Sequence, residues 1–143
     1  PFVPTEKMEA EGVKVPATLE ELYANCDYIS LHIPANEKTK GSINYELLSK
    51  MPKGGCLVNT ARKEVIDEAG MEKLLADRAD LKYVTDIAPA NQAVLAEKFT
   101  TRFFATPKKQ GAETAEANMN AGLAAARQIV GFIERGETKF KVN

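Results

Sequence analysis

The amino-acid sequence predicts an α/β fold, a doubly wound parallel sheet that is present as an incomplete domain. Two observations support this fold class. Four short segments rich in β-forming residues alternate with short helical patterns, as in parallel sheets whose strands are joined by helices. Each β-forming segment also ends at or near a proline or a charged loop, which is where a strand passes into a loop.

The composition is typical of one soluble globular domain. The 143 residues are 44% hydrophobic and 27% charged, and the formal net charge is -1. This balance gives no electrostatic basis for nucleic-acid binding, and no apolar run approaches the length of a membrane span, so we expect neither partner. Cys26 and Cys56 have no metal-ligand or disulfide spacing, so we expect no metal site and a cytoplasmic protein.

The first part of the chain is predicted to contain a helix followed by a strand. Thr18 and Glu21 form a capping box that begins a short helix over residues 19–26. The β-forming segment 27–33 comes next and ends at Pro34, as expected of a central strand that leads into a loop.

The next predicted unit again joins a short helix to a strand. Asn44 can cap a helix over residues 45–51. The Pro-Lys-Gly-Gly turn at 52–55 then leads into a second buried strand that begins at Cys56. After this strand, Asp67 offers a side-chain oxygen to the free N–H groups of a third helix.

The rest of the chain is predicted to complete the sheet and to add a long helix. The third helix covers residues 68–76, and strands follow at 81–87 and 102–105. The long helix begins near Thr114 and ends at Gly136, which suits a left-handed helix end. It carries an apolar stripe that we interpret as a packing face. The stripe consists of Ala115, Met119, Leu123, Ala126, Val130 and Ile133.

These 143 residues contain a candidate anion-binding residue but no glycine-rich phosphate loop. The nine glycines have neither the G-x-G-x-x-G spacing of dinucleotide-binding loops nor that of a Walker loop. Arg62 stands just past the carboxyl end of the second predicted strand, where ligands bind in open α/β sheets. A fixed cation there is suited to holding an anion, and a surface ion pair with Glu64 or Glu68 is the alternative.

Several linked motifs resemble those of the D-isomer-specific 2-hydroxyacid dehydrogenases. They are CDYISLHIP at 26–34, Thr39, GSIN at 41–44, and NTAR at 59–62 followed by DE at 67–68. Because these motifs occur together and the resemblance extends from about Pro1 to Gly136, nearly the whole chain, the signal is far more specific than a single glycine motif. The resemblance implies a Rossmann-type domain, NAD as cofactor, and hydride transfer between NAD and a small-molecule 2-hydroxy acid.

The resemblance also implies roles for individual residues. Arg62 would grip the carboxylate and the adjacent carbonyl oxygen of a 2-oxo acid with its planar charged fork. His32 is the only histidine of the sequence, but the histidine at this place in the family lies beside the cofactor and does not transfer the proton. Asp86 would contact the nicotinamide carboxamide. The residues expected to line the cofactor are His32, Pro34, Thr39, Thr60, Ala61 and Asp86.

Two positions depart from the family pattern. Asn91 stands where a glutamate orients the catalytic histidine, and Lys108 stands after a Thr-Pro pair where that histidine is expected. Either catalysis has been lost, or a lysine transfers the proton. Because a nearby carboxylate would keep a lysine charged and unable to act as a base, the joint loss favours Lys108 as the catalytic acid–base residue, with Lys109 as the alternative.

A lysine in place of the family histidine indicates which enzymes of the family this chain resembles. A minority of D-3-phosphoglycerate dehydrogenases are similar in lacking the histidine–glutamate pair and using a lysine. The resemblance therefore implies an NAD-dependent enzyme of this type, which acts in the first step of serine biosynthesis and forms homodimers. The alternatives are a glycerate or hydroxypyruvate reductase and a non-enzymatic NAD-sensing interaction protein.

The resemblance also predicts the domain boundaries. Residues 1–112 would form the second half of the NAD-binding domain, and residues 113–143 a long helix and tail that pack towards a substrate domain. In the family, Pro-Phe often follows the acidic residue that binds the adenosine ribose, and this chain begins with Pro1 and Phe2. We therefore expect a fragment that lacks the phosphate loop and is not a competent dehydrogenase on its own.

Overall fold

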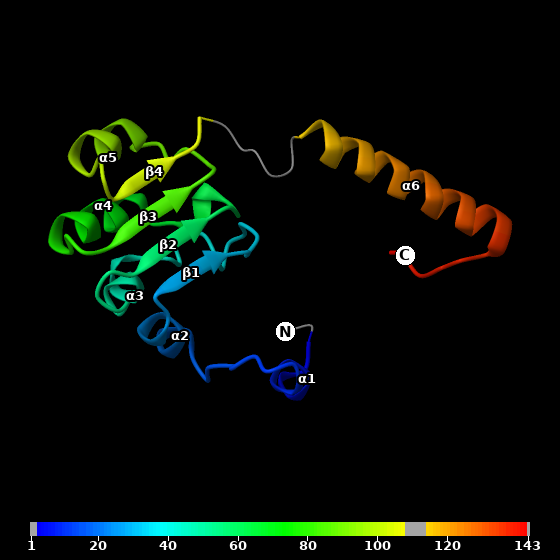
Figure 1. Cartoon of the computed structure of the whole chain (residues 1–143), viewed down its shortest axis with the longest axis horizontal. Helices are drawn as coiled ribbons and strands as arrows, with labels where there is room; N and C mark the ends of the chain where they lie inside the picture. The colour runs from blue at the N-terminus through cyan, green and yellow to red at the C-terminus, as the bar shows by residue number, and fades with distance from the viewer. Residues whose placement is uncertain (1–2, 108–113, 143) are drawn as a thin grey trace. The chain divides into compact units, whose positions relative to one another are not determined.

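The computed structural model describes residues 3–107 and 114–142 (Figure 1). The chain divides into two compact units, Pro1–Pro107 and Lys108–Asn143. The first unit contains a parallel sheet with flanking helices, and the second contains one long helix and the tail that follows it. The predicted α/β fold with a parallel sheet is therefore confirmed in the first unit.

The sheet has four strands in the order β1-β2-β3-β4, and every neighbouring pair is parallel. The strands are β1 (Tyr28–Leu31), β2 (Cys56–Asn59), β3 (Lys82–Thr85) and β4 (Phe103–Ala105). All four predicted strands are present. The strands β1, β3 and β4 are shorter than the predicted segments. The ends of the segments 27–33 and 81–87 enter the loops at the carboxyl edge of the sheet, whereas the segment 102–105 loses only its first residue, Arg102.

Helices join successive strands of this sheet. α2 (Leu19–Asn25) precedes β1, and the connections between strands contain α3 (Tyr45–Ser49), α4 (Glu68–Asp77) and α5 (Gln92–Lys98). Two predicted caps are confirmed. Oγ1 of Thr18 accepts the N–H of Glu21 at 3.1 Å, and Oδ1 of Asn44 accepts the N–H of Leu47 at 3.0 Å.

The hydrophobic core lies between one face of the sheet and the helices α3, α4 and α5. Inward side chains of the strands, such as Leu57 and Tyr83, are 2% and 1% exposed and join buried leucines of these helices. Each connection moves on to the next strand in the same direction, so right-handed crossovers place all three helices on one face. On the opposite face, Tyr28 and Phe104 are 79% and 59% exposed.

The predicted side-chain cap at Asp67 is wrong. Asp67 stands at the N-cap of α4, but its carboxylate makes no capping hydrogen bond. The carboxylate lies against Gly70, where a β-carbon would come within 2.5 Å of Oδ2 of Asp67 and within 3.0 Å of the backbone nitrogen of Tyr45. Glycine at position 70 therefore allows the first turn of α4 to pack closely against the first turn of α3.

The sequence pattern does not predict α1 (Thr5–Ala10) or α5. No residue of α1 is buried, so this helix lacks the apolar periodicity by which helices are recognised. α5 buries only Leu95, and its N-cap residue Asn91 makes no side-chain capping hydrogen bond. Neither the apolar period nor a capping signal was available at these two places.

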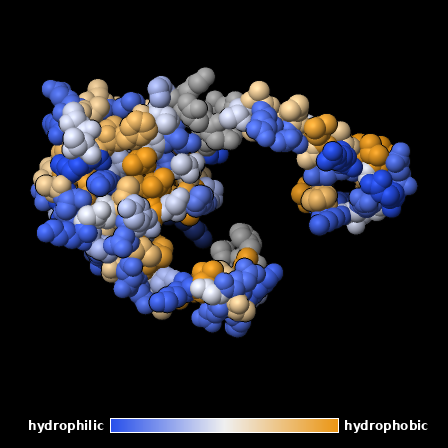
Figure 2. Space-filling view, in the orientation of Figure 1, coloured by the Kyte–Doolittle hydropathy of each residue, from blue (hydrophilic) through white to orange (hydrophobic). Residues whose placement is uncertain are grey.

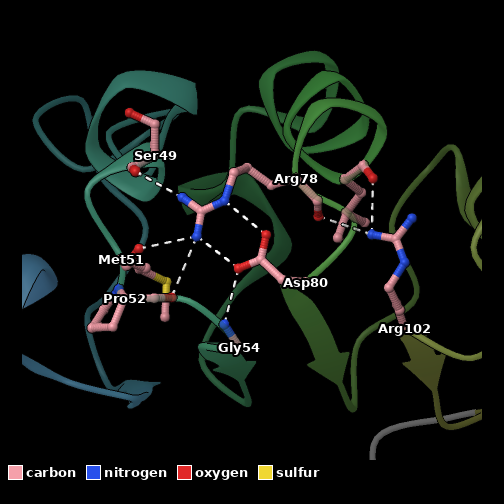
Figure 3. Close-up of polar contacts among 8 residues, drawn as sticks. Ser49, Met51, Pro52, Gly54, Arg78, Asp80 and Arg102 are labelled. Carbon is pink, nitrogen blue, oxygen red and sulfur yellow. Dashed lines mark hydrogen bonds and ion pairs between the residues drawn. The ribbon is translucent and has the colours of Figure 1, made fainter.

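At the amino edge of the sheet, Arg78 and Asp80 connect the turn before β2 to the turn before β3 (Figure 3). The Arg78 guanidinium contacts the Asp80 carboxylate at 2.7 and 2.9 Å, and Asp80 also accepts the N–H of Gly54 at 2.9 Å. Arg78 further donates to the backbone oxygens of Ser49 and Met51 at 3.1 and 3.3 Å. We call these contacts the Arg78–Asp80 clamp; the Arg78 hydrogen bonds hold the pKa of Asp80 well below its usual range.

The long helix of the second unit is α6 (Ala115–Arg135). Oγ1 of Thr114 accepts the N–H of Ala117 at 3.0 Å, so the helix begins where the sequence predicts. It ends at Gly136, which has a φ of 64° and adopts the predicted left-handed conformation. Both predicted ends of this helix are therefore confirmed.

The apolar stripe of α6 lies at the surface of the second unit. Met119, Leu123 and Ile133 are 62%, 48% and 74% exposed, and Figure 2 shows hydrophobic residues along this helix. Ile133 of the stripe lines a pocket together with Phe140 and Val142 of the tail. Among the helices that the structure describes, none combines the length and apolarity needed to cross a bilayer.

Candidate active site

The loops after β1 and β2 are joined to each other at the carboxyl edge of the sheet. An isolated parallel bridge pairs Ile43 with Ile66. The N–H of Ile43 donates to the oxygen of Val65 at 3.0 Å, and the N–H of Asp67 donates to the oxygen of Ile43 at 3.0 Å. These backbone hydrogen bonds make one connected structure of the two loops that carry most of the predicted site residues.

Arg62 lies in a turn after β2 that is fixed by the side chain of Asn59. Asn59 is the last residue of β2 and is 0% exposed. Its Oδ1 accepts the N–H of Ala61 at 3.1 Å, and its Nδ2 donates to the backbone oxygen of Arg62 at 3.0 Å. Both halves of one amide group therefore hold the turn, as in an Asx turn.

The Arg62 side chain is exposed and is not used by a neighbouring carboxylate. Its Nη1 donates to the backbone oxygen of Ala61 at 2.7 Å. Among the described residues, no ion pair joins Arg62 to Glu64 or Glu68. The Glu68 carboxylate instead accepts the N–H of Ala90 at 2.9 Å. The guanidinium thus remains accessible to an anion from solution.

Asp86 follows β3 and lies beside the Arg62 turn. The N–H of Asp86 donates to the backbone oxygen of Asn59 at 3.3 Å, which joins the ends of the two strands. Oδ1 of Asp86 is buried and has no hydrogen-bond partner among the described residues. A buried acceptor without a partner is costly, so an N–H group of a ligand would be a favourable partner at this position.

The predicted residues after β1 lie at the same edge, because Leu31 is in register with Asn59. Nε2 of His32 is 2.9 Å from Oγ of Ser30, so this histidine makes a local hydrogen bond at the strand end. Thr39 donates its hydroxyl to the oxygen of Pro34 at 2.6 Å, and this contact closes the loop.

The structure brings seven of the eight predicted site residues to one edge of the sheet. Thr60 is exposed in the turn after β2, and Ala61 is partly buried against the core. With the loop after β1, Arg62 and Asp86, they surround the carboxyl ends of β1, β2 and β3. The predicted acid–base residues Lys108 and Lys109 lie outside the described residues.

Asn91 occupies a place where an amide fits better than a carboxylate. Its Nδ2 lies 3.4 Å from both the backbone oxygen of Glu68 and Oε2 of Glu72. Lys98 donates to Glu72 at 2.8 Å, and this hydrogen bond, helped by Asn91, lowers the pKa of Glu72. A carboxylate at position 91 would face the Glu72 charge, whereas the amide donates to it. Oδ1 of Asn91 is buried without a partner among the described residues.

Two polar residues of this edge were missed by sequence reasoning. Asn59 is part of the NTAR motif, and Thr85 lies within the β-forming segment 81–87, but neither was assigned a role. The available signal was a polar residue at the end of an apolar strand, just before a turn. Across residues 3–107 and 114–142, no cluster of three or more His, Cys, Asp or Glu side chains could hold a metal ion.

Known proteins similar to this chain are dehydrogenases. Residues 1–108 match the model of the D-isomer specific 2-hydroxyacid dehydrogenase, NAD binding domain. The chain is 31% identical over 143 residues to D-3-phosphoglycerate dehydrogenase of Haemophilus influenzae, covering 96% of this chain and 35% of the relative. It is 33% identical over 141 residues to the enzyme of the same name from Methanocaldococcus jannaschii, covering 96% and 26%. The chain thus spans about a third or less of these relatives.

A solved structure gives the same result. The crystal structure of NAD+-bound 3-phosphoglycerate dehydrogenase from Entamoeba histolytica matches with a TM-score of 0.81 and 50% sequence identity, over 100% of this chain and 45% of that one. The family match includes the whole described sheet and each site residue on its carboxyl edge. This chain therefore belongs to the D-isomer specific 2-hydroxyacid dehydrogenase family and is part of its NAD binding domain.

Proposed function

We propose that the protein containing this chain is an NAD-dependent oxidoreductase that transfers a hydride between NAD and a 2-hydroxy acid. D-3-phosphoglycerate is the substrate we favour, because phosphoglycerate dehydrogenases are among the similar proteins. The observation that carries the proposal is the accessible Arg62 guanidinium at the carboxyl edge of the sheet. Asn59 holds the backbone turn of Arg62, and the N–H of Asp86 donates to the backbone oxygen of the same Asn59.

Arg62 binds and orients the acid in this proposal. Its planar guanidinium can donate two parallel N–H bonds to the carboxylate and the neighbouring carbonyl oxygen of a 2-oxo acid. The backbone turn that carries Arg62 is fixed before the ligand arrives, so little backbone conformational entropy is lost when the acid binds.

The residues around Asp86 fit the nicotinamide end of NAD, which supplies the hydride acceptor when it is bound. The unpartnered Oδ1 of Asp86 is suited to accept a carboxamide N–H. His32, Thr60 and Ala61 line the same edge in this proposal. Pro34 and Thr39 shape the loop, because the Thr39 hydroxyl donates to the Pro34 oxygen.

Lys108 transfers the proton of the substrate hydroxyl in this proposal, and Lys109 is the alternative. A neutral lysine amine accepts the hydroxyl proton as the hydride leaves the carbon that bears the hydroxyl. In the reverse direction, the ammonium returns the proton. Asn91 supports this role, because its amide adds no negative charge that would keep a lysine protonated.

The proposal is tested by NAD reduction with the protein expressed from its natural gene. D-3-phosphoglycerate, D-glycerate and other 2-hydroxy acids are compared for wild type, Lys108→Ala and Lys109→Ala. We expect turnover with D-3-phosphoglycerate that falls by roughly 10²–10⁴-fold in Lys108→Ala, as for loss of a general base, and little in Lys109→Ala. The opposite ranking would assign the proton to Lys109, and NAD binding without turnover on any acid would refute the enzymatic proposal.

We also propose that the protein acts as a homodimer, as the family resemblance implies. Light scattering on the same protein should give twice the mass of one chain. A single-chain mass at micromolar concentration contradicts this part of the proposal without affecting the reaction.

A further inference from the structure

Asn59 and Thr85 form a pair of buried polar residues in the middle of the sheet's carboxyl edge. They are 0% and 1% exposed, whereas most buried residues of the first unit are hydrophobic. Each is the last residue of its strand, and the two are paired in register between β2 and β3. Burying polar side chains is unfavourable unless their hydrogen bonds are made, so their partners indicate what they do.

Two hydrogen bonds join the Asn59 side chain to the Arg62 turn. Oδ1 accepts the N–H of Ala61 at 3.1 Å and Nδ2 donates to the oxygen of Arg62 at 3.0 Å. The backbone of Arg62 is therefore held by the side chain of Asn59, a buried residue of β2. The position of the exposed guanidinium depends on this backbone.

The Thr85 hydroxyl connects the same strand end to the turn that carries Asp86. Oγ1 of Thr85 lies 2.8 Å from the backbone oxygen of Asn59, to which it can donate, and it accepts the N–H of Ile87 at 3.1 Å. The N–H of Asp86 approaches the same Asn59 oxygen at 3.3 Å. The backbone oxygen of Asn59 is thus contacted by two consecutive residues, Thr85 at the end of β3 and Asp86 in the turn that follows.

We propose that Asn59 and Thr85 are positioning residues that set the place of Arg62 relative to Asp86. Asn59 holds the turn of the acid-binding arginine, and Thr85 holds the turn of the nicotinamide-binding carboxylate against the backbone of Asn59. Both act through these turns and neither touches a ligand, since both are fully buried. This inference rests on the proposed function, because it assigns Arg62 to the acid and Asp86 to the cofactor.

The first test uses a matched pair at position 85 in the complete protein. Thr85→Val keeps the shape but lacks the hydroxyl, and Thr85→Ser restores the hydroxyl without the methyl group. We expect the KM for NAD to rise about tenfold in Thr85→Val and to return to within about threefold of wild type in Thr85→Ser, as for loss of one buried hydrogen bond at the turn of Asp86. An equal KM in all three folded proteins would overturn the proposal.

Asn59→Ala tests the other half of the pair. It removes both hydrogen bonds of the Arg62 turn, so we expect a rise in the acid KM of about tenfold or more. Asp80→Asn at the amino edge is the control for a loss of stability without a change in the site. If Asp80→Asn raised the acid KM as much as Asn59→Ala did, the effect would be one of stability alone, and the positioning role would be rejected.

Amide hydrogen exchange provides a readout that needs no catalysis. In Asn59→Ala, exchange at the N–H of Ala61 should become about tenfold faster relative to Leu57 inside β2, because its acceptor is gone. In Thr85→Val, the same acceleration is expected at the N–H of Ile87. Unchanged relative exchange at both amides would refute the positioning role. If wild type turned over no 2-hydroxy acid while these amides responded, the proposed function would fail and the hydrogen-bonded pair would stand.

Discussion

The polar groups at the two edges of the sheet differ in how completely they are hydrogen-bonded. At the amino edge, the guanidinium of Arg78 donates to Asp80 and to backbone oxygens, and Asp80 accepts a further N–H. At the carboxyl edge, Oδ1 of Asp86 and Oδ1 of Asn91 are buried without partners among the described residues. The amino edge is arranged for stability, whereas the carboxyl edge leaves polar atoms available to a ligand.

The largest effect is expected from Arg62→Ala. Because the guanidinium makes two charge-assisted hydrogen bonds to the acid in our proposal, kcat/KM should fall on the order of 10²–10³-fold. The melting temperature should stay unchanged, because the exposed side chain donates only to the preceding carbonyl. Steady-state kinetics and calorimetry measure the two quantities. If Arg62→Ala lowered the melting temperature and kept its activity, Arg62 would serve stability and not acid binding, contrary to the proposed difference between the edges.

Arg78→Met should give the opposite result. It leaves Asp80 without its cation and the carbonyls of Ser49 and Met51 without a donor, so the free energy of unfolding should fall by about 2–3 kcal/mol. The kinetic constants of the folded protein should not change. Urea unfolding measures the loss. Lys98→Met is the control, because the exposed Lys98–Glu72 pair is screened by solvent and its loss should barely change the free energy of unfolding.

The next prediction concerns the Asp86 carboxylate at the carboxyl edge. Asp86→Ala removes the unpartnered acceptor, and the KM for NAD should rise about tenfold, as expected for one lost hydrogen bond. Asp86→Asn retains an oxygen at the same place and should lose less. Equal NAD affinities in wild type and both variants would show that Oδ1 of Asp86 does not accept a hydrogen bond from the cofactor.

The smallest effect is the pH dependence that Asp80 contributes at the amino edge. The Arg78 hydrogen bonds depress the pKa of Asp80 in the folded state, so the ionised carboxylate stabilises the fold above its ordinary pKa of about 4. This stabilisation should be lost as the pH falls below about 4 towards the depressed value. Asp80→Asn should remove that part of the slope of unfolding free energy against pH. The carboxyl-edge variant Asp86→Asn should retain it.

The sequence predicted the elements that have a local chemical signal. Thr18 and Asn44 were recognised as caps, and each accepts the expected N–H. The long helix was predicted to begin near Thr114, whose hydroxyl accepts the N–H of Ala117. Four β-forming segments became four parallel strands, since residues buried on a parallel sheet leave a continuous apolar run. α5 was missed because its single buried residue, Leu95, creates no period.

The candidate site was predictable in part. Arg62 and Asp86 follow strands, and their place on one edge comes from parallel pairing. Asn59 had a signal, since it is a polar residue at the end of an apolar strand, but its hydrogen-bond partners become visible only when the turn is closed. Asp67 failed as a cap because the close approach at Gly70, a tertiary contact, determined where its carboxylate lies. Local sequence thus predicted positions along the chain better than contacts across it.

The bridge between Ile43 and Ile66 has a consequence for recombination among relatives. Because the loops after β1 and β2 share backbone hydrogen bonds, they form one exchangeable module although about twenty residues separate them along the chain. A chimaera that imports only one loop, or changes its length alone, breaks the ladder at Ile43. Loop grafting to alter acid preference should therefore move both segments together, and directed evolution should randomise them as a single unit.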